Sequence, residues 1–246
     1  MKRIISILFF FITIFTFGKN NFTYAEKTTY NAYWNGIKVG TVVLEVLPKD
    51  SNSDDFTFKM TMKTNSFADK FYSSRQTITS IIDSSMSYSK MYQQTGKEKK
   101  KEKDKRVEFD WTNNKIKYYS DKKLSKEMNL QKGMLDPLSI FYFLRNQEMK
   151  IGKSIDCNVT DGKRIVNGHA VVSREETIET DDFGEIETFV VEPDLRGLGG
   201  VFSSSDDAQM IIWFSQGESR LPVKIRSKVR VGSFTAELVK IEGVDL

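Results

Sequence analysis

Apolar and polar residues alternate along most of the chain after about residue 28, which is the pattern of strands with one buried face. The segment 106–111 is the clearest example, because Val107, Phe109 and Trp111 lie on one face and charged residues lie between them on the other. Turn signals separate several such segments: Asn35-Gly36, Asn113-Asn114, Asp161-Gly162, Asp181-Asp182-Phe183-Gly184 and Gly232-Ser233. Roughly a dozen strands with local connections predict a mainly β protein, whose antiparallel sheet is long enough to curve strongly or to form an open barrel.

One segment, 136–145, breaks this alternation and is predicted to be a short helix. Asp136 is suited to cap it, because a carboxylate accepts hydrogen bonds from the free N–H groups of the first turn, and Pro137 is tolerated at the first helical position. Apolar side chains surround the helix almost completely: Leu138, Ile140, Phe141, Tyr142, Phe143 and Leu144. A helix of this kind is buried. We therefore expect a plug helix near residues 136–146, with the curved sheet wrapped on it.

Arg145 is the most suggestive single charge of the chain. It lies on the same side of the predicted helix as Leu138, Phe141 and Tyr142. A buried guanidinium needs a partner, and three kinds remain open: a carboxylate of the sheet, backbone carbonyls near the end of the helix, or the anionic head of a ligand. A structural role is favoured over a ligand contact. If the protein binds a ligand, Arg145, Phe141, Tyr142 and Leu138 are the residues predicted to line its site.

The first residues predict export. Two basic residues precede an apolar run from Ile4 to Phe17, which is shorter than the about 20 residues of a transmembrane span. The run and the following Thr23-Tyr24-Ala25 fit a secretory signal peptide of residues 1–25, so that the mature chain begins at Glu26. A retained N-terminal anchor is the alternative. We expect a single antiparallel β domain over residues 26–246, in the periplasm or otherwise exported, with no transmembrane span once the signal is removed.

Charge argues against one class of partner. The chain has 37 basic and 33 acidic residues, but three of the basic residues belong to the predicted signal peptide. Removing them leaves 34 basic against 33 acidic residues, so the net charge falls from +4 to +1. A nearly neutral mature chain lacks the basic excess typical of nucleic-acid-binding proteins, and nucleic acid is not expected as a partner.

The residues that usually carry catalysis or bind metals are sparse. His169 is the only histidine and Cys157 the only cysteine, so neither a Ser-His-Asp triad nor the usual set of zinc ligands is evident. Both fall in predicted strands, where a satisfied histidine and a small buried cysteine are the ordinary interpretations. The glycines of 194–200 precede no helical pattern, which disfavours a phosphate-binding loop. We predict no catalytic residues, no metal and no cofactor.

Two further segments bear on the surface of the protein. Ser66–Tyr72 is predicted to be a short helical turn before a strand. The run Lys97–Arg106 holds seven lysine or arginine residues against three acidic ones. The favoured interpretation is a solvated hairpin end that discourages pairing at a sheet edge, and the alternative is a contact with anionic lipid headgroups or cell-wall polymers.

Three groups of residues together resemble a known family. An early segment has the pattern Tyr-x-x-x-Trp-x-Gly-x-x-x-Gly from Tyr30 to Gly40, and the helix segment reads Asp-Pro-Leu-Ser, then aromatic residues, then Arg145. A strand with Trp213 is followed by Arg-Leu-Pro-Val-Lys and Gly232. These motifs resemble the bacterial exported family known as domain of unknown function 3108. The resemblance implies a strongly curved antiparallel sheet similar to the lipoprotein-carrier (LolA/LolB-like) architecture, where a sheet wraps helices around an apolar cavity. It implies no catalytic residues.

Three hypotheses of function remain. The first is a non-enzymatic protein that binds or carries an apolar or amphipathic molecule of the cell envelope, such as a lipid or lipoprotein-like ligand. The second is an assembly or scaffold protein that docks an envelope protein partner. The third is a hydrolase of envelope polymer, which is the least favoured because no pair of carboxylates is singled out. A continuous apolar pocket would favour the first, and a filled barrel with a large exposed apolar patch the second.

Overall fold

The computed structural model describes residues 22–198, 209–229 and 232–246. The first half of the chain forms β1 (Lys27–Trp34), β2 (Ile37–Val46), β3 (Phe56–Thr64), the 3-10 turn η1 (Ala68–Lys70), β4 (Ser74–Ile82), β5 (Ser89–Glu98), β6 (Lys101–Asp110), β7 (Lys115–Ser120) and β8 (Lys123–Asn129). The second half forms β9 (Met134–Leu135), α1 (Ser139–Arg145), β10 (Ser154–Thr160), β11 (Ile165–Thr180), β12 (Gly184–Asp194), β13 (Gln209–Ser215), β14 (Pro222–Val229) and β15 (Gly232–Glu242).

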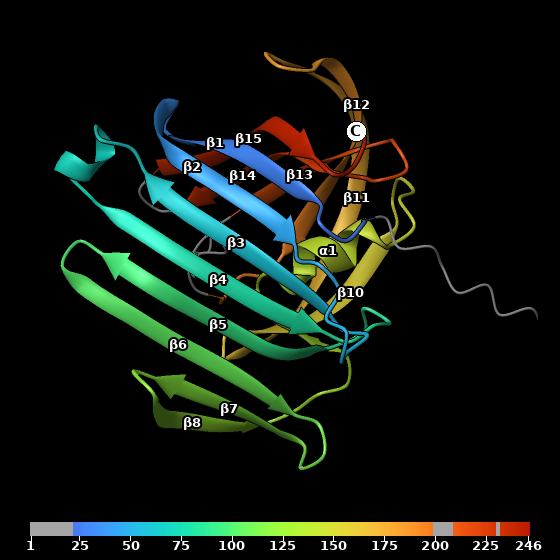
Figure 1. Cartoon of the computed structure of the whole chain (residues 1–246). Coiled ribbons are helices and arrows are strands. Elements are labelled where there is room, and N and C mark those ends of the chain that lie inside the picture. The colour runs from blue at the N-terminus through green and yellow to red at the C-terminus, as the bar shows by residue number, and fades with distance from the viewer. Residues whose placement is uncertain (1–21, 199–208, 230–231) are drawn as a thin grey trace, which may run out of the picture.

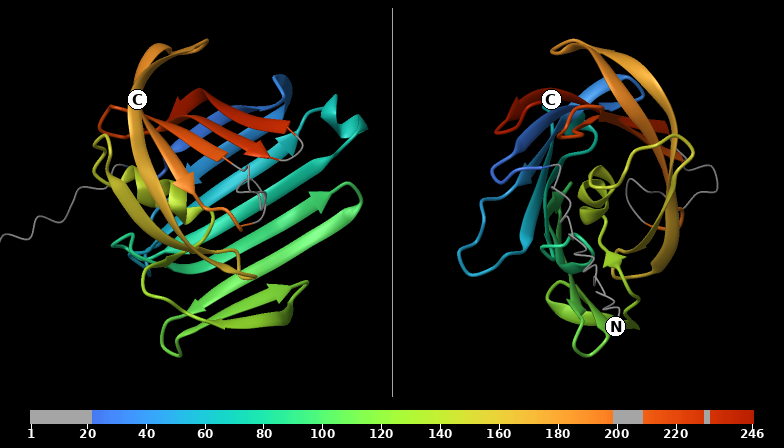
Figure 2. Two further views of the ribbon diagram at one scale, coloured as in Figure 1. Left: turned by 180° about the vertical axis from the view of Figure 1, so that it is seen from behind. Right: turned by 90° about the vertical axis from the view of Figure 1, so that its right-hand side faces the viewer.

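These strands form one 15-stranded sheet in the order β8-β7-β6-β5-β4-β3-β2-β1-β15-β14-β13-β12-β11-β10-β9 (Figure 1). All neighbouring strands pair antiparallel except β9 and β10, which are parallel. The sheet curves round without closing, so β8 and β9 are left as its two edges (Figure 2). The predicted fold class, a curved antiparallel sheet wrapped on one short buried helix, is confirmed, with more strands than the alternation had indicated.

The predicted hairpin turns follow local chemistry. Asn35 and Gly36 both have positive φ angles, 48° and 82°, which is what a two-residue turn between right-twisted strands requires. Gly162 lies in the turn between β10 and β11, and a Cβ there would come within 2.6 Å of Val107 and Tyr118. Only glycine therefore lets this turn pack on the inner face of β6 and β7. Gly232 and Ser233 differ from the prediction, because β15 already begins at Gly232.

Connections between strands alternate between two ends of the sheet, because neighbouring strands run in opposite directions. α1 lies inside the curve at one end, together with the segment 22–26 and the last residues of the chain (Figures 1 and 2). We call this the closed end. The other end carries the β1–β2, β5–β6 and β7–β8 turns and η1, and we call it the hairpin end.

The basic run Lys97–Arg106 forms the β5–β6 hairpin, as expected, but its role at a sheet edge is not what the sequence suggested. β5 and β6 have neighbours on both sides, β4 and β7, so they are not edge strands. Opposite charges face each other across the hairpin, with Lys97 paired to Glu102 and Glu98 to Lys101. Such cross-strand pairs support strands that continue beyond the apolar core. The protection of a free edge is therefore the wrong interpretation.

Candidate functional site

A buried carboxylate fixes the start of α1. Asp136 is fully buried, and its Oδ2 accepts hydrogen bonds from the hydroxyls of Ser80 in β4, Ser89 in β5 and Ser139, each at 2.6 Å. Its Oδ1 accepts from the backbone N–H groups of Leu138 at 2.8 Å and Ser139 at 3.0 Å. The helix itself begins at Ser139, two residues later than the predicted first helical position Pro137, yet Asp136 makes the capping bonds. In addition, it joins α1 to two strands of the sheet.

Arg145 fixes the other end of α1. Its guanidinium donates from Nη1 to Glu26 Oε1 at 2.7 Å and from Nη2 to Oε2 at 3.1 Å. Nε and Nη2 also donate to the backbone carbonyl of Ser219, at 3.1 and 2.7 Å. Arg145 is 1% exposed and Glu26 3%. A buried ion pair of this kind is tolerated because further hydrogen bonds satisfy the guanidinium. A carboxylate and a backbone carbonyl, two of the partners considered from the sequence, therefore both bind Arg145.

Aromatic rings pack beside this ion pair. The ring of Tyr142 stacks on Phe58 in β3, with 3.6 Å between centroids and 5° between planes. Phe22, which is buried, meets Tyr142 edge to face at 5.7 Å and Phe58 at 5.5 Å. The Tyr142 hydroxyl has no hydrogen-bond partner among the described residues, and burial raises the pKa of this phenol well above its ordinary value. Tyr142 is therefore a neutral side chain within an apolar cluster.

The four predicted ligand-lining residues are thus brought together, but they are all buried. Leu138, Phe141, Tyr142 and Arg145 are between 1% and 7% exposed. Sequence reasoning missed Glu26 as the partner of Arg145. Glu26 shares the inward face of the first strand with Thr28 and Tyr30, so its position in the alternation was the available signal. The four residues form a packed floor at the closed end.

The concave face of the sheet becomes accessible on the other side of α1. Along β3, Phe58 is fully buried against α1, whereas Met60 and Met62 on the same face are partly exposed. Phe234 of β15 is likewise partly buried. These three side chains are apolar and lie beyond the helix toward the hairpin end. α1 therefore covers only part of the concave face, and we call the remainder the open half.

Polar side chains form the opposite wall of the open half. Val107 of β6 is fully buried, but Lys105 and Lys103, the next inward residues of that strand, are partly exposed. Gln94 of β5 faces Lys105 across the strand pair. Burial lowers the pKa of the Lys105 ammonium group, and the charges of Lys103 and Lys163 lower it further. Lys103 forms an ion pair with Glu98. The open half thus has an apolar wall on β3 and β15 and a partly buried polar wall on β5 and β6, which includes Lys105.

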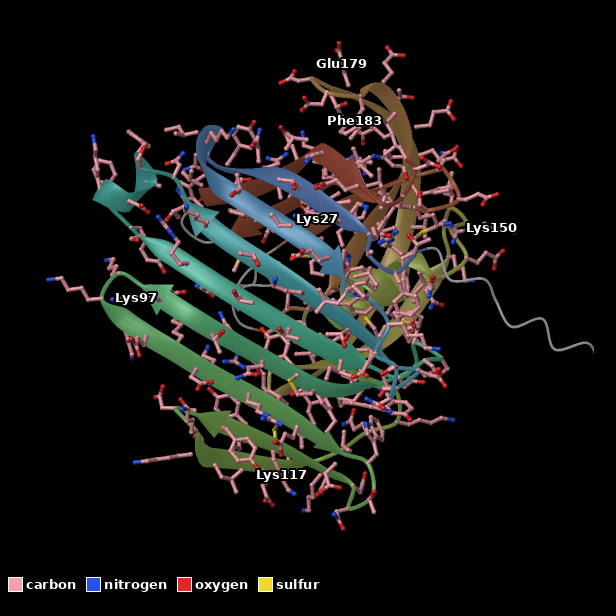
Figure 3. All side chains as sticks on the ribbon, in the orientation of Figure 1. Lys27, Lys97, Lys117, Lys150, Glu179 and Phe183 are labelled. Carbon is pink, nitrogen blue, oxygen red and sulfur yellow. The ribbon has the colours of Figure 1, made fainter. Side chains whose placement is uncertain are left out.

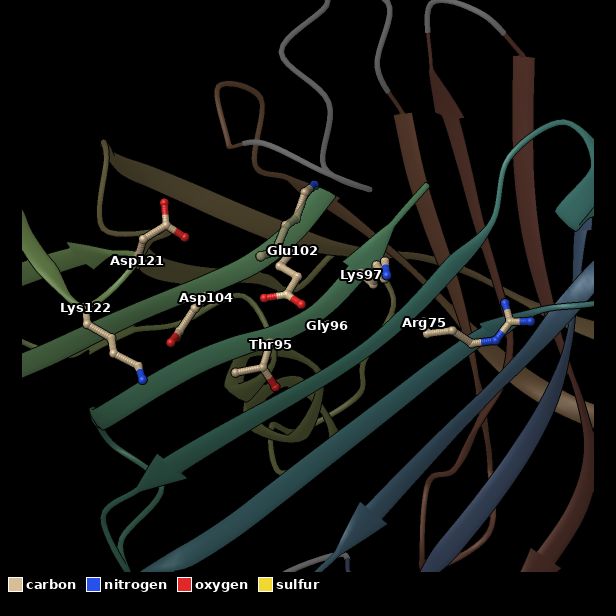
Figure 4. A pocket seen from close by; sticks show the side chains of 9 residues that line it. Arg75, Thr95, Gly96, Lys97, Glu102, Asp104, Asp121 and Lys122 are labelled. Carbon is tan, nitrogen blue, oxygen red and sulfur yellow. The ribbon is translucent and has the colours of Figure 1, made fainter. Parts of the chain in front are cut away.

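Two hollows on the outer, convex face are less suited to a ligand. The larger, of about 570 Å³, lies over β4, β5 and β6 (Figure 4). Its lining includes basic and acidic side chains in similar number: Arg75, Lys97, Lys103 and Lys122 against Glu102, Asp104 and Asp121. A neighbouring hollow of about 360 Å³ shares Asp104 and Lys122. Charges of both signs alternate here, so neither hollow selects a ligand by charge.

The described residues contain no group of three or more histidine, cysteine or acidic side chains placed to hold a metal ion. Cys157 is buried in β10, as expected, and burial raises the pKa of its thiol to about 12. His169 is exposed on β11. Within the described ranges, no helix is both long and apolar enough to cross a membrane.

The architecture defines a β-barrel-like protein with a plug helix, and comparison with known proteins supports this class. The chain belongs to the family described as "Protein of unknown function (DUF3108)", whose model matches residues 29–239. No curated protein matches the chain.

Two solved structures were compared with the chain. The crystal structure of a β-barrel-like protein of domain of unknown function DUF1849 from Brucella abortus is similar, with a TM-score of 0.59 and 14% identity over 90% of this chain and 98% of that one. At this identity the likeness concerns the fold alone. The hypothetical protein CT021 from Chlamydia trachomatis has a TM-score of 0.35 and 8% identity over 87% of this chain and 86% of its own. At this TM-score we infer no shared fold.

Proposed function

We propose that this protein is a non-enzymatic binding protein of the cell envelope, which carries an amphipathic molecule in the open half of its curved sheet. One observation carries the proposal: α1 covers only part of the concave face, so Met60 and Met62 are partly exposed where Phe58 on the same strand is fully buried. Concave, largely apolar surfaces with a few placed polar groups are the usual sites of small molecules.

The two walls of the open half suggest how such a molecule would lie. Its apolar part would contact Met60, Met62 and Phe234, since methionine side chains adapt to irregular apolar shapes. An anionic head would face Lys105, whose partial burial makes an opposite charge favourable. Leu138, Phe141, Tyr142 and Arg145 would form the floor of the site. Because Arg145 already binds Glu26, its role would be to hold that floor in place.

Export and cleavage after Ala25 are the second part of the proposal. The segment before this point packs on the closed end: Phe22 lies among Phe56, Phe58 and Tyr142, and Thr23 Oγ1 donates to the Gly243 carbonyl at 3.0 Å. Cleavage there would remove the Phe22 ring from the aromatic cluster. The intact mass of the exported protein tests this, since a chain beginning at Glu26 is expected. A mass that includes residues 22–25 would place the cleavage upstream, and retention of the whole leader in a membrane fraction would show an anchor.

Purification without detergent tests whether a ligand is carried. The protein isolated from its own envelope should release an amphiphile on organic extraction, identified by mass spectrometry. A fluorescent fatty-acid probe should bind the emptied protein and be displaced by that extract. A protein that yields no amphiphile and binds no probe would overturn the proposal.

Matched variants locate the site. Lys105→Gln on the concave face should weaken binding of an anionic probe more than that of a neutral one, whereas Arg106→Gln, next to it on the outer face, should change neither. Met62→Glu should block the apolar wall, and Thr61→Glu on the outer face of the same strand is its control. Equal effects of the inner and outer variants would contradict a site in the open half.

A further inference from the structure

Large apolar side chains are exposed together at the hairpin end. Phe67 and Phe71, on either side of η1, touch edge to face with 5.7 Å between ring centroids, and they are 50% and 74% exposed. Tyr72, the next residue, is 46% exposed. Ile37 at the start of β2 is 56% exposed, and the Asn65 side-chain amide ties the η1 segment to this strand by donating to the Lys38 carbonyl at 2.8 Å. Exposed large apolar residues that gather in one place mark a contact surface.

Hydrogen bonds fix the position of the η1 turn that carries these rings. Asp69 receives two hydrogen bonds from Arg75, at 2.6 and 3.0 Å, and one from the Thr64 hydroxyl at 2.6 Å. These bonds hold the pKa of Asp69 at about 2. Asn65 Oδ1 accepts from the Ala68 N–H at 2.8 Å and so begins the turn. The aromatic side chains are thus presented to solvent by an ordered turn that neighbouring strands hold in position.

Lysines surround the exposed rings. Six exposed ones lie on η1 and on the strand ends beside it: Lys38, Lys63, Lys70, Lys97, Lys99 and Lys100. The ammonium group of Lys99 lies 5.5 Å from the centroid of the Tyr72 ring. Of the acidic side chains in this region, Asp69 and Glu98 form ion pairs with Arg75 and Lys103, and Glu102 lies opposite Lys97 across the β5–β6 hairpin. The surface around the rings therefore carries an excess of positive charge.

We propose that this docking rim, formed by Ile37, Phe67, Phe71, Tyr72 and the six lysines, binds the surface of an anionic lipid bilayer. Aromatic side chains are favoured at the boundary between headgroups and hydrocarbon, and each lysine near an anionic surface adds attraction. The rings project from a turn and do not line a groove, which suits insertion among headgroups better than enclosure of a protein segment. The inference goes beyond the proposed function, because it rests on the exposure and charge of the rim and not on a ligand.

Sedimentation with vesicles tests the docking rim. The full chain should sediment with vesicles of equal parts phosphatidylglycerol and phosphatidylcholine and much less with phosphatidylcholine alone, and added salt should release it. Lys97→Gln and Lys99→Gln should each weaken binding by about fivefold. The double variant F67S/F71S should lose most of the binding that remains at high salt. Phe71→Trp should show a blue shift of its emission with anionic vesicles, beyond that of the natural protein.

The opposite end of the molecule provides a matched control. Lys150 and Ile151 follow α1 at the closed end, where Ile151 is 55% exposed, so the pair has the same chemistry as the rim without its aromatic rings (Figure 3). The double variant K150Q/I151S should bind vesicles like the natural protein. Three results would overturn the proposal: unchanged binding of F67S/F71S, an equal loss in K150Q/I151S, or no binding to anionic vesicles. The last result would indicate that the rim contacts a protein partner instead of a bilayer. The fatty-acid probe reports on the open half separately, so this test fails independently of the proposed function.

Discussion

Charged and aromatic side chains are buried at the closed end of the sheet and exposed at its hairpin end. At the closed end Asp136 and Arg145 are buried, and several hydrogen bonds satisfy each of them, while Tyr142 and Phe58 stack out of contact with water. At the hairpin end Phe67 and Phe71 face solvent among unburied lysines. The side chains of the closed end therefore determine where α1 lies, whereas those of the docking rim contribute little to the fold and are available for contact.

The largest effect on stability is expected at the ion pair. Arg145→Ala leaves the Glu26 carboxylate buried without its partner, and we expect a loss of about 3–5 kcal/mol in the free energy of unfolding. Urea unfolding measures it. The variant Glu26→Gln, which retains a hydrogen-bond acceptor, should lose less. A change below about 1 kcal/mol in Arg145→Ala would show that the pair is exposed to water and that the closed end is not as tight as described.

A comparable but smaller loss is expected from the floor of the open half. Phe141→Ala removes a buried ring and leaves a cavity, at a cost near the lower part of about 3–5 kcal/mol. Urea unfolding with a fluorescence readout tests it. Phe71→Ala deletes the same ring from an exposed position and is the matched control. Equal effects of the two variants would remove the contrast between the two ends.

The next largest loss of stability is expected from a change to Asp136, the carboxylate that anchors α1. Asp136→Asn keeps the shape of the side chain but replaces an acceptor of hydroxyl hydrogen bonds by an amide donor, so one of the serine hydroxyls loses its partner. We expect a loss of about 1–3 kcal/mol. The thermal midpoint and urea unfolding should agree on this value. A neutral result would indicate that Ser80, Ser89 and Ser139 satisfy one another without the carboxylate.

The smallest effect on stability is expected at the docking rim. Phe71→Ser changes a side chain that is 74% exposed, and the free energy of unfolding should stay within about 0.5 kcal/mol of the natural value. The same urea experiment measures it. Loss of vesicle binding together with unchanged stability would show that the ring serves contact and not the fold. A destabilisation above about 1 kcal/mol would instead mean that the ring is part of the core.

The sequence predicted features that depend on neighbouring residues better than features that depend on residues far apart in the chain. Asn35-Gly36 identified a turn because its chemistry is local, and the apolar surround of 138–144 identified a buried helix for the same reason. The partner of Arg145 lies 119 residues away, and alternation alone does not tell which inward acid faces it. Ser80 and Ser89 bind Asp136, yet a serine in a strand carries no signal of burial. Strands β5 and β8 were not indicated because each has only two large apolar residues, Met91 and Tyr92 in β5 and Leu124 and Met128 in β8, so no alternation results.

The exposure of the rim was equally difficult to predict. Ser66–Tyr72 was expected to form a short helical turn, and η1 confirms it. A single turn is too short for an apolar face to emerge from its period, so the sequence did not show that Phe67 and Phe71 point to solvent. Their exposure results from the bonds of Asp69 with Arg75 and Thr64, which hold the turn outside the curve of the sheet.

The central pairing of the sheet has a consequence for the time course of folding. β1 lies between β2 and β15, and its residues from Lys27 to Trp34 pair with partners from Glu242 to Phe234. The middle of the sheet therefore joins the two extremes of the chain and cannot form until the last strand has been synthesised. Sheets with such distant contacts fold slowly, on the order of milliseconds to seconds. Under the export proposed above, such a chain has the time to pass a membrane before its core closes.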